Sequence, residues 1–336
     1  MNFYITNVNG IGGTAQRAQE MVARIAQTNF GFTPLGIYRY TWPDEPGQSL
    51  GARIDGIIAS LQAGKQDIIF LQMPTWITPE WDMEFINHIR PYGIHLVIFI
   101  QDILSVTDNA WDILSREINI YNQAEVIIAH SQQMIDFLKE HGLTVKKTIS
   151  LDLMDHVTPF EFSHPAQFHH SISYAGSYDP NKSNFIRNWN YPDVRFRIYS
   201  KPQDWFDQQN LEFVSWKDEA ELLYDLRNNG GFGMNWTDNE NWEKYSAIND
   251  SFKLSTYIAA GIPVIAQSSL TQHQMIQDKG LGIVADTLDE AVDKVAHTTE
   301  EQYNQMAQNV EHFAPLVRHG FFTKRALVNA MFELFN

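Results

Sequence analysis

A lysine among hydroxyl residues opens a predicted helix near position 253. The helix ends at Gly261, and Pro263 then begins an apolar strand. The free N–H groups at a helix start favour an anion, and the Lys253 ammonium adds a full positive charge. We predict that this segment clamps a diphosphate without a metal, the alternative being an ordinary helix. The predicted clamp consists of Ser251, Phe252, Lys253, Leu254, Ser255 and Thr256.

A glycine-rich loop near the N-terminus is the second candidate site. Gly10, Gly12 and Gly13 follow an apolar strand and precede a helix, a position that suits a phosphate or a sugar. Their spacing fits neither the dinucleotide-binding fingerprint nor the Walker A pattern. Thr14 would present the first helical hydroxyl to a ligand, whereas the alternative interpretation is a tight turn.

Further candidates lie at other predicted strand ends. Asp102 follows the apolar run Ile94–Ile100, where a carboxylate could orient an acceptor hydroxyl or accept its proton. Tyr38, Arg39 and Tyr40 form an aromatic stretch that suits an acceptor sugar or a half-buried loop. The chain has 12 histidines, but none has the spacing of a metal site. We therefore expect no metal and no cofactor.

Strands and helices alternate over most of the chain. The first 145 residues alternate buried apolar strands with amphipathic helices, and a second alternating series follows from Ser171. Between them, residues 146–170 carry charges, prolines and histidines, so we predict an interdomain linker there. The expected strands are Phe3–Val8, Leu35–Ile37, Asp67–Gln72, Ile94–Ile100, Val126–Ala129, Ser171–Ala175, Val194–Tyr199, Leu211–Val214, Gly233–Trp236, Pro263–Ala266 and Gly282–Val284. From about residue 300 the pattern is helical.

Composition excludes several classes of protein. A length of 336 residues favours two domains, and 44% hydrophobic residues can build a large core. A net charge of −16 disfavours partners such as nucleic acids and anionic membranes. The start of the chain lacks the features of a signal peptide, and the longest apolar run is too short to span a bilayer. Since there is no cysteine either, we expect a cytoplasmic protein.

Five segments together resemble the glucosyltransferase 3 family, which has the two-domain GT-B architecture of many glycosyltransferases. These segments are residues 12–18, 71–76, 120–131 and 173–176, together with the helix of Lys253. The resemblance implies an α/β fold of two facing, doubly wound Rossmann-like domains with the active site in the cleft between them. Together with the linker, this predicts an acceptor-side domain over 1–155, a nucleotide-sugar domain over 156–315, and a helix over 316–336 that packs back on the first domain.

The resemblance also implies an activity. Family members transfer a hexose from a UDP-sugar to N-acetylglucosamine (GlcNAc) on Ser or Thr of a serine-rich-repeat adhesin, in the cytoplasm of Gram-positive bacteria. They also self-associate, so we expect a homo-oligomer. Either glucose or GlcNAc remains open as the donor sugar. Alternative functions are transfer to a polysaccharide or lipid acceptor, a non-catalytic nucleotide-sugar-binding subunit, and a sugar-binding protein.

Site residues follow from the same resemblance. It implies that the UDP diphosphate is held by Thr14 in the glycine loop, next to Gly13, and by Lys253 with Ser251, Ser255 and Thr256. It also implies that Lys182 is a basic nucleotide contact and that Trp216 stacks on the uracil. Two features depart from related enzymes. Ile248 and Thr256 occupy the places of a glutamate pair common in retaining GT-B enzymes, and Gln101 stands where relatives often have histidine. The stereochemical outcome therefore cannot be carried over.

Overall fold

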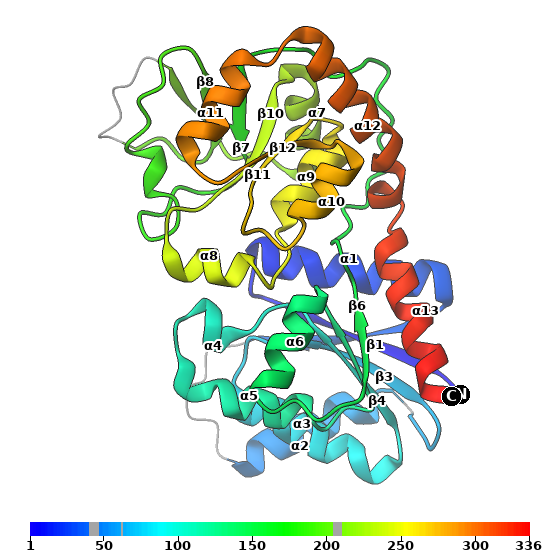
Figure 1. Cartoon of the computed structure of the whole chain (residues 1–336). Coiled ribbons are helices and arrows are strands. Elements are labelled where there is room, and N and C mark those ends of the chain that lie inside the picture. Colours follow the sequence, from blue (N-terminus) through cyan, green and yellow to red (C-terminus); the bar gives the residue numbers. More distant parts are fainter. Residues whose placement is uncertain (40–46, 62, 204–209) are drawn as a thin grey trace. The chain divides into compact units, whose positions relative to one another are not determined.

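The computed structural model describes residues 1–39, 47–61, 63–203 and 210–336. The chain divides into two compact units. Unit 1 contains Met1–Asp152 and Phe322–Asn336, and unit 2 contains Leu153–Phe321. Each unit is built on a parallel six-stranded sheet with helices (Figure 1).

Unit 1 has the strand order β2-β1-β3-β4-β5-β6. Strands β3 and β4 are buried almost throughout because helices cover both faces of the sheet. In Figure 1, α1 runs along one side of this sheet and α2, α3 and α5 along the other. The strands are β1 (Phe3–Asn9), β2 (Thr33–Tyr38), β3 (Ile68–Met73), β4 (His95–Ile100), β5 (Val126–Ala129) and β6 (Lys147–Ser150).

Side-chain caps begin two of the helices in unit 1. The hydroxyl of Thr78 accepts from the Trp81 N–H at the start of α3, and the Ser131 hydroxyl does the same for Met134 in α6. The last helix, α13, belongs largely to unit 1, where Arg325 pairs with Asp152 at 2.7 Å. The helices are α1 (Gly13–Phe30), α2 (Gly47–Ala59), α3 (Pro79–Ile89), α4 (Leu104–Thr107), α5 (Leu114–Tyr121), α6 (Gln132–Glu140) and α13 (Phe321–Phe335).

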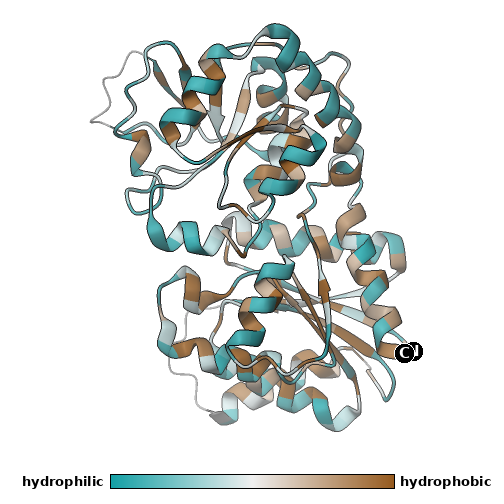
Figure 2. Ribbon diagram, in the orientation of Figure 1, coloured by the Kyte–Doolittle hydropathy of each residue, from teal (hydrophilic) through white to brown (hydrophobic). Residues whose placement is uncertain are grey.

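Unit 2 has the strand order β12-β11-β10-β7-β8-β9 around an aromatic-rich core. Figure 2 shows the hydrophobic residues concentrated in the strands and the hydrophilic ones on the outer faces of the helices. The strands are β7 (Ser171–Tyr174), β8 (Arg195–Tyr199), β9 (Leu211–Val214), β10 (Phe232–Asn235), β11 (Val264–Gln267) and β12 (Gly282–Ala285). The helices are α7 (Glu219–Asn229), α8 (Glu240–Ser246), α9 (Phe252–Ala260), α10 (His273–Lys279), α11 (Leu288–His297) and α12 (Glu300–Arg318).

The topology identifies where ligands bind in such sheets. In unit 2, β7 and β10 are neighbours, but the chain leaves them toward opposite edges of the sheet; β1 and β3 have the same relation in unit 1. Open parallel sheets bind ligands at the carboxyl ends of two such strands. Each unit therefore has one expected binding edge, formed by the loops after these strands.

The predicted two-sheet α/β fold is confirmed, with local corrections. The predicted linker begins too early, because Lys147–Ser150 forms β6 and pairs with β5. The short helices α4 and α8 lie in segments where the sequence pattern predicts no element. None of the helices in the described part of the chain combines the length and apolar character that a membrane span requires.

Candidate functional site

Lys253 lies at the start of α9, beside the loop that follows β7. Its Nζ is 5.2 Å from the ring centroid of Tyr174, the last residue of β7. A Cβ atom at Gly176 would lie 2.8 Å from the Lys253 Cε, so the glycine lets the lysine side chain take this position. No carboxylate pairs with Lys253 anywhere in the described ranges. A half-buried ammonium without an anionic partner is an unbalanced charge, and a bound anion would balance it.

Burial changes the acidity of this lysine. Removal from water lowers the pKa of Lys253 to about 8, because burial disfavours the charged ammonium. The N-terminus of α9 carries a partial positive charge of its own, which also favours an anion there. A diphosphate at this position would satisfy both positive groups.

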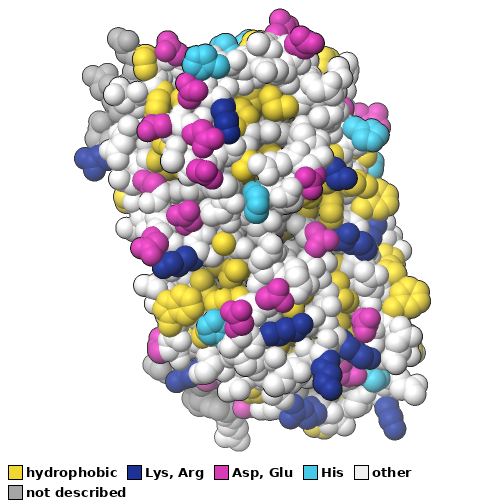
Figure 3. Space-filling model, viewed as in Figure 1, with side chains coloured by type: hydrophobic (Ala, Val, Ile, Leu, Met, Phe, Trp, Pro, Cys, Tyr) yellow, Lys and Arg dark blue, Asp and Glu magenta, His cyan; other side chains and the backbone are white. Residues whose placement is uncertain are grey.

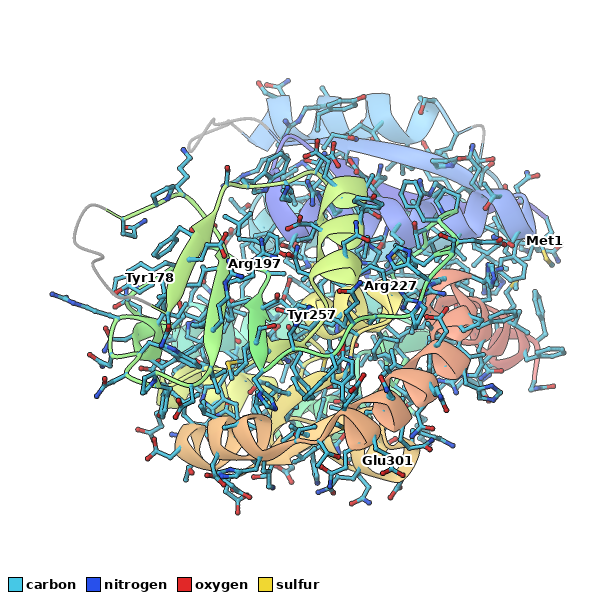
Figure 4. All side chains as sticks on the ribbon, turned by 90° about the horizontal axis from the view of Figure 1, so that it is seen from above. Met1, Tyr178, Arg197, Arg227, Tyr257 and Glu301 are labelled. Carbon is cyan, nitrogen blue, oxygen red and sulfur yellow. The ribbon has the colours of Figure 1, made fainter. Side chains whose placement is uncertain are left out.

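Tyr257 fixes α9 beneath the binding edge of unit 2. Its hydroxyl accepts from the Ala175 N–H at 2.8 Å and donates to the Met234 carbonyl at 3.0 Å, so it joins the ends of β7 and β10. The ring fits because Gly233 has no side chain: a Cβ there would lie 2.1 Å from the Tyr257 Cγ. Tyr257, labelled in Figure 4, lies where α9 meets the strands of unit 2. The position of Lys253, one turn earlier, follows from this packing.

The other members of the predicted clamp divide into two groups. Ser251, Phe252 and Lys253 are partly exposed, whereas Leu254, Ser255 and Thr256 are buried. Contact between any of them and a nucleotide stays a prediction, but only the first three have surface that a ligand can reach.

The buried hydroxyls hold the start of unit 2 instead. Ser255 donates to the Met154 carbonyl at 2.6 Å, and Thr256 lies 3.1 Å from the Nδ1 of His156. The buried Asp250 carboxylate accepts from the Met154 N–H, and burial raises the pKa of Asp250 to about 7. Helix α9 therefore supports the first residues after the unit boundary as well as Lys253.

The two other predicted nucleotide contacts, Lys182 and Trp216, follow strands β7 and β9 at the carboxyl edge of the unit 2 sheet. The Lys182 Nζ is 3.5 Å from the centroid of the Trp242 ring, and the Lys182 carbonyl accepts from Thr237 at 2.7 Å. Trp216 follows the edge strand β9 and is 62% exposed. Their nucleotide contacts stay predictions. Sequence reasoning missed Trp242, whose only signal was an aromatic residue in the polar segment after β10.

The glycine loop of unit 1 directs backbone donors toward one point. The N–H groups of Gly10, Ile11 and Gly12 all donate to the Gln16 Oε1, at 3.1, 3.2 and 2.9 Å. Three donors converging on one oxygen form a cradle suited to a polar or anionic group. Gly13 and Thr14, next to this cradle, are exposed. Their role as diphosphate contacts stays a prediction.

The aromatic stretch after β2 lies next to that loop. Arg39 donates its N–H to the Asn9 carbonyl at 2.9 Å, and its own carbonyl is 3.1 Å from the Cβ position of Gly10. Tyr38 is 69% exposed, and Tyr40 lies outside the described residues. The structure therefore brings Tyr38 and Arg39 to the binding edge of unit 1, while acceptor binding by this stretch stays a prediction.

At the binding edge of unit 1, the buried side chains of Gln72, Gln101 and His130 are joined by hydrogen bonds. The Gln72 amide nitrogen donates to the backbone carbonyls of Thr6 and Gln19, which leaves its oxygen to accept from Gln101 at 2.8 Å. The Gln101 oxygen must then accept from His130 Nε2, 3.4 Å away. His130 is therefore the Nε2–H tautomer, and its buried Nδ1 has no donor in the described part of the chain.

Asp102 directly follows Gln101, which these hydrogen bonds hold in place. Asp102 is partly exposed at the end of β4. The backbone just beyond it is fixed by Glu117, whose carboxylate accepts from the Leu104 and Ser105 N–H groups at 2.8 and 3.0 Å. Asp102 thus sits on a well-held loop at the binding edge, and its catalytic role stays a prediction.

The hydrogen bonds that join Gln72, Gln101 and His130 can be tested at His130. Burial lowers the pKa of His130 to about 4. Below about pH 6.5, His130 is therefore protonated in the unfolded chain but still neutral in the native state. The free energy of unfolding then falls as the pH falls toward 4. We expect the wild type to lose about 2 kcal/mol more unfolding free energy between pH 7 and pH 5 than His130→Gln, which keeps a donor for Gln101. Urea denaturation at both pH values measures the difference, and equal losses would refute the buried neutral imidazole.

The histidines of the linker region make ordinary hydrogen bonds. His164 Nε2 is 2.7 Å from the Asn228 side-chain oxygen, and His170 Nε2 is 2.9 Å from the Thr298 carbonyl. Within the described ranges no three His, Asp or Glu side chains gather as metal ligands would.

Comparison with known proteins connects this geometry to a family. Residues 2–153 match the model of the glucosyltransferase 3-like N-terminal domain, and residues 172–330 match that of the C-terminal domain. The chain is 35% identical over 336 residues to "Glucosyltransferase 3" of Streptococcus parasanguinis, with 99% of each chain covered. It is 34% identical over 342 residues to the Streptococcus gordonii protein of the same name, again with 99% of each covered.

Solved structures agree on the fold. The Anabaena protein HepE in complex with UDP-glucose superimposes with a TM-score of 0.66 at 12% identity, covering 97% of this chain and 98% of HepE. The E. coli trehalose-6-phosphate protein bound to UDP-2-fluoro glucose gives a TM-score of 0.67 at 9% identity, covering 98% and 99%. With both family domains matched in order along the chain, and with the two Rossmann-like sheets that such enzymes share, this protein belongs to the glucosyltransferase 3 family of glycosyltransferases.

Proposed function

We propose that this enzyme transfers a hexose, with glucose favoured over GlcNAc, from a UDP-sugar to GlcNAc linked to Ser or Thr of a serine-rich-repeat adhesin. The two streptococcal relatives are named glucosyltransferases, and the HepE structure contains UDP-glucose on the same fold. The proposed location is the cytoplasm, where UDP-sugars are made and where a chain without cysteine needs no disulfide.

One observation carries the donor assignment. Lys253 is a half-buried cation without a carboxylate partner among the described residues, at a helix start and next to a glycine that makes room for it. Such a cation stabilises the charge that develops on a departing diphosphate. The support for UDP as leaving group is thus the electrostatics of α9 together with the UDP-glucose held by a protein of the same fold.

The proposed reaction breaks the bond between the anomeric carbon and the β-phosphate oxygen. A new bond joins that carbon to a hydroxyl oxygen of GlcNAc, and the hydroxyl proton leaves. We assign Asp102 as the residue that orients this hydroxyl or accepts its proton. Lys253 and the N–H groups of α9 stabilise the departing UDP, so the proposal requires no metal, and excess EDTA should leave the rate unchanged.

A donor and acceptor panel tests the proposal. The purified chain is incubated with UDP-glucose or UDP-GlcNAc and with a Ser-rich peptide carrying GlcNAc, and mass spectrometry measures the product. We expect the peptide to gain one hexose, faster from UDP-glucose. Transfer only to glycans or lipids would replace the adhesin with another acceptor, and a chain that binds UDP-sugars without turnover would be a non-catalytic subunit.

Self-association is part of the proposal, and α13 offers a surface for it. Phe332 and Phe335 are 64% and 56% exposed on this helix, and Phe321 at its start is also exposed. Figure 3 shows hydrophobic side chains along the edge of the molecule where α13 lies. Covering such side chains with a second copy removes apolar surface from water.

Phe332→Glu should therefore weaken self-association at least tenfold, because a charge would have to enter an apolar interface. Light scattering after size-exclusion chromatography over a range of concentrations measures the change. Tyr92→Glu, at another exposed aromatic position, serves as the control and should behave like the wild type. An identical oligomer in both variants would exclude this face of α13.

A further inference from the structure

The two loops at the binding edge of unit 2 are joined by a lysine and a tryptophan. Lys182 lies in the loop after β7, and Trp242 lies on α8 after β10. The Lys182 Nζ is 3.5 Å from the centroid of the Trp242 ring, well within the range of a cation–π interaction. These two loops follow the neighbouring strands from which the chain departs in opposite directions, which is where such sheets bind ligands.

The indole is positioned independently of the lysine. Asn239 caps α8, and its side-chain oxygen accepts from the N–H groups of Asn241 and Trp242 at 3.0 and 3.1 Å. The Trp242 ring also packs edge-on against Tyr245 with 6.0 Å between centroids. The ring face is thus a fixed surface.

The backbone of the lysine is fixed as well. The Lys182 N–H donates to the Asp179 carbonyl at 3.0 Å, and its carbonyl accepts from Thr237 at 2.7 Å. With both backbone groups held, the freedom that remains lies in the four-carbon side chain. The Trp242 ring face restricts that freedom and so helps to set the location of the ammonium.

A second lysine, Lys253, lies at the ends of the same two strands, β7 and β10. Lys253 lies beside Tyr174, the last residue of β7, and beside Gly176 in the loop that follows, and its helix is tied to β10 through Tyr257. The edge therefore presents one cation placed by packing against glycine and another placed by an aromatic face. Two positive charges at the ends of β7 and β10 match the charge of a diphosphate better than either alone.

We propose that Trp242 is a positioning residue that holds the Lys182 ammonium ready for the phosphate groups of the donor; this inference rests on the proposed nucleotide-sugar donor. A lysine already restricted by a ring face loses less conformational freedom when it binds an anion, so its contact contributes more to affinity. Trp242 acts through Lys182 and touches neither the base nor the sugar.

The test compares UDP with uridine, which lacks the phosphates. Isothermal titration calorimetry measures both ligands with the full-length wild type, Trp242→Leu and Trp242→Phe. We expect Trp242→Leu to bind UDP about 3- to 30-fold more weakly while its affinity for uridine is unchanged. Trp242→Phe, which keeps an aromatic face, should regain most of the loss. Lys244→Met removes a surface lysine from the same helix; it is the charge-matched control for the Lys182→Met variant described next and should bind UDP like the wild type.

Lys182→Met tests whether Trp242 acts through the lysine. It should lower UDP affinity by at least as much as Trp242→Leu, and adding Trp242→Leu to it should cost nothing further. It also keeps the indole, so it tests the lysine if Trp242→Leu fails to fold. Unchanged UDP affinity in either variant, or an equal loss for UDP and uridine, would overturn the positioning role. Absence of UDP binding by the wild type would instead overturn the proposed donor itself.

Discussion

Replacing Lys253 with methionine is expected to lower kcat/KM for the UDP-sugar by about 100-fold. The ammonium has no carboxylate partner in the described part of the chain, so its charge is available to the diphosphate. A hydrogen bond to a charged group contributes about 1.5–3 kcal/mol, and about 2.7 kcal/mol corresponds to 100-fold. Methionine keeps the length and helix propensity of lysine, so α9 should remain folded. Initial rates over a range of donor concentrations measure the loss.

The pH dependence of the wild type adds an independent check. Because the pKa of Lys253 is lowered to about 8, the fraction of charged ammonium in the free enzyme falls as the pH rises above that value. The donor KM should then rise by up to tenfold per pH unit above 8, and Lys253→Met should lose this dependence. Lys279→Met removes an exposed lysine of the same unit. It should leave kcat/KM and the pH dependence of the donor KM as they are in the wild type. If Lys253→Met keeps wild-type kinetics, the diphosphate is bound elsewhere.

The parts of the fold that sequence reasoning predicted are those with a strong apolar signal. Strands such as β3 and β4 are runs of Ile, Val, Leu and Phe, because both of their faces are covered. Strand β6 carries Lys147 and Thr148 at the edge of the sheet, so no such run marks it. Helix α8 has only seven residues, and most of them are polar. Short or peripheral elements depend on their neighbours more than on their own sequence.

The candidate site shows the same division. Lys253 could be chosen from its place at a predicted helix start, since charge and helix position are local properties. Ser255 and Thr256 resemble ligand-binding hydroxyls in sequence, but a distant segment, Met154–His156, passes over them and takes their hydrogen bonds. The pairing of Lys182 with Trp242 is also invisible locally, because 60 positions separate them and only the strand order brings their loops together.

Gly233→Ala is expected to reduce the free energy of unfolding by about 3 kcal/mol. The new Cβ would lie 2.1 Å from the Tyr257 Cγ, in a strand and a helix that are both buried, so the ring has no free space to enter. Displacing Tyr257 also breaks its bonds to Ala175 and Met234, which leaves two polar groups unsatisfied. Donor binding should weaken in parallel, because Lys253 lies one turn earlier on the same helix. Chemical denaturation and UDP titration measure the two effects.

Two further variants separate the clash from a general cost of replacing glycine. Gly56→Ala lies within α2 with nothing within 4 Å of the new Cβ, and it should stabilise the protein by about 0.5–1 kcal/mol through helix propensity. Tyr257→Leu removes the ring that the alanine strikes, so the double variant with Gly233→Ala should be less destabilised than the sum of its two single changes. Strict additivity would show that the ring does not cause the cost. A coupling between the two positions would mean that the smallest residue of β10 determines where α9, and with it the Lys253 ammonium, meets the binding edge of unit 2.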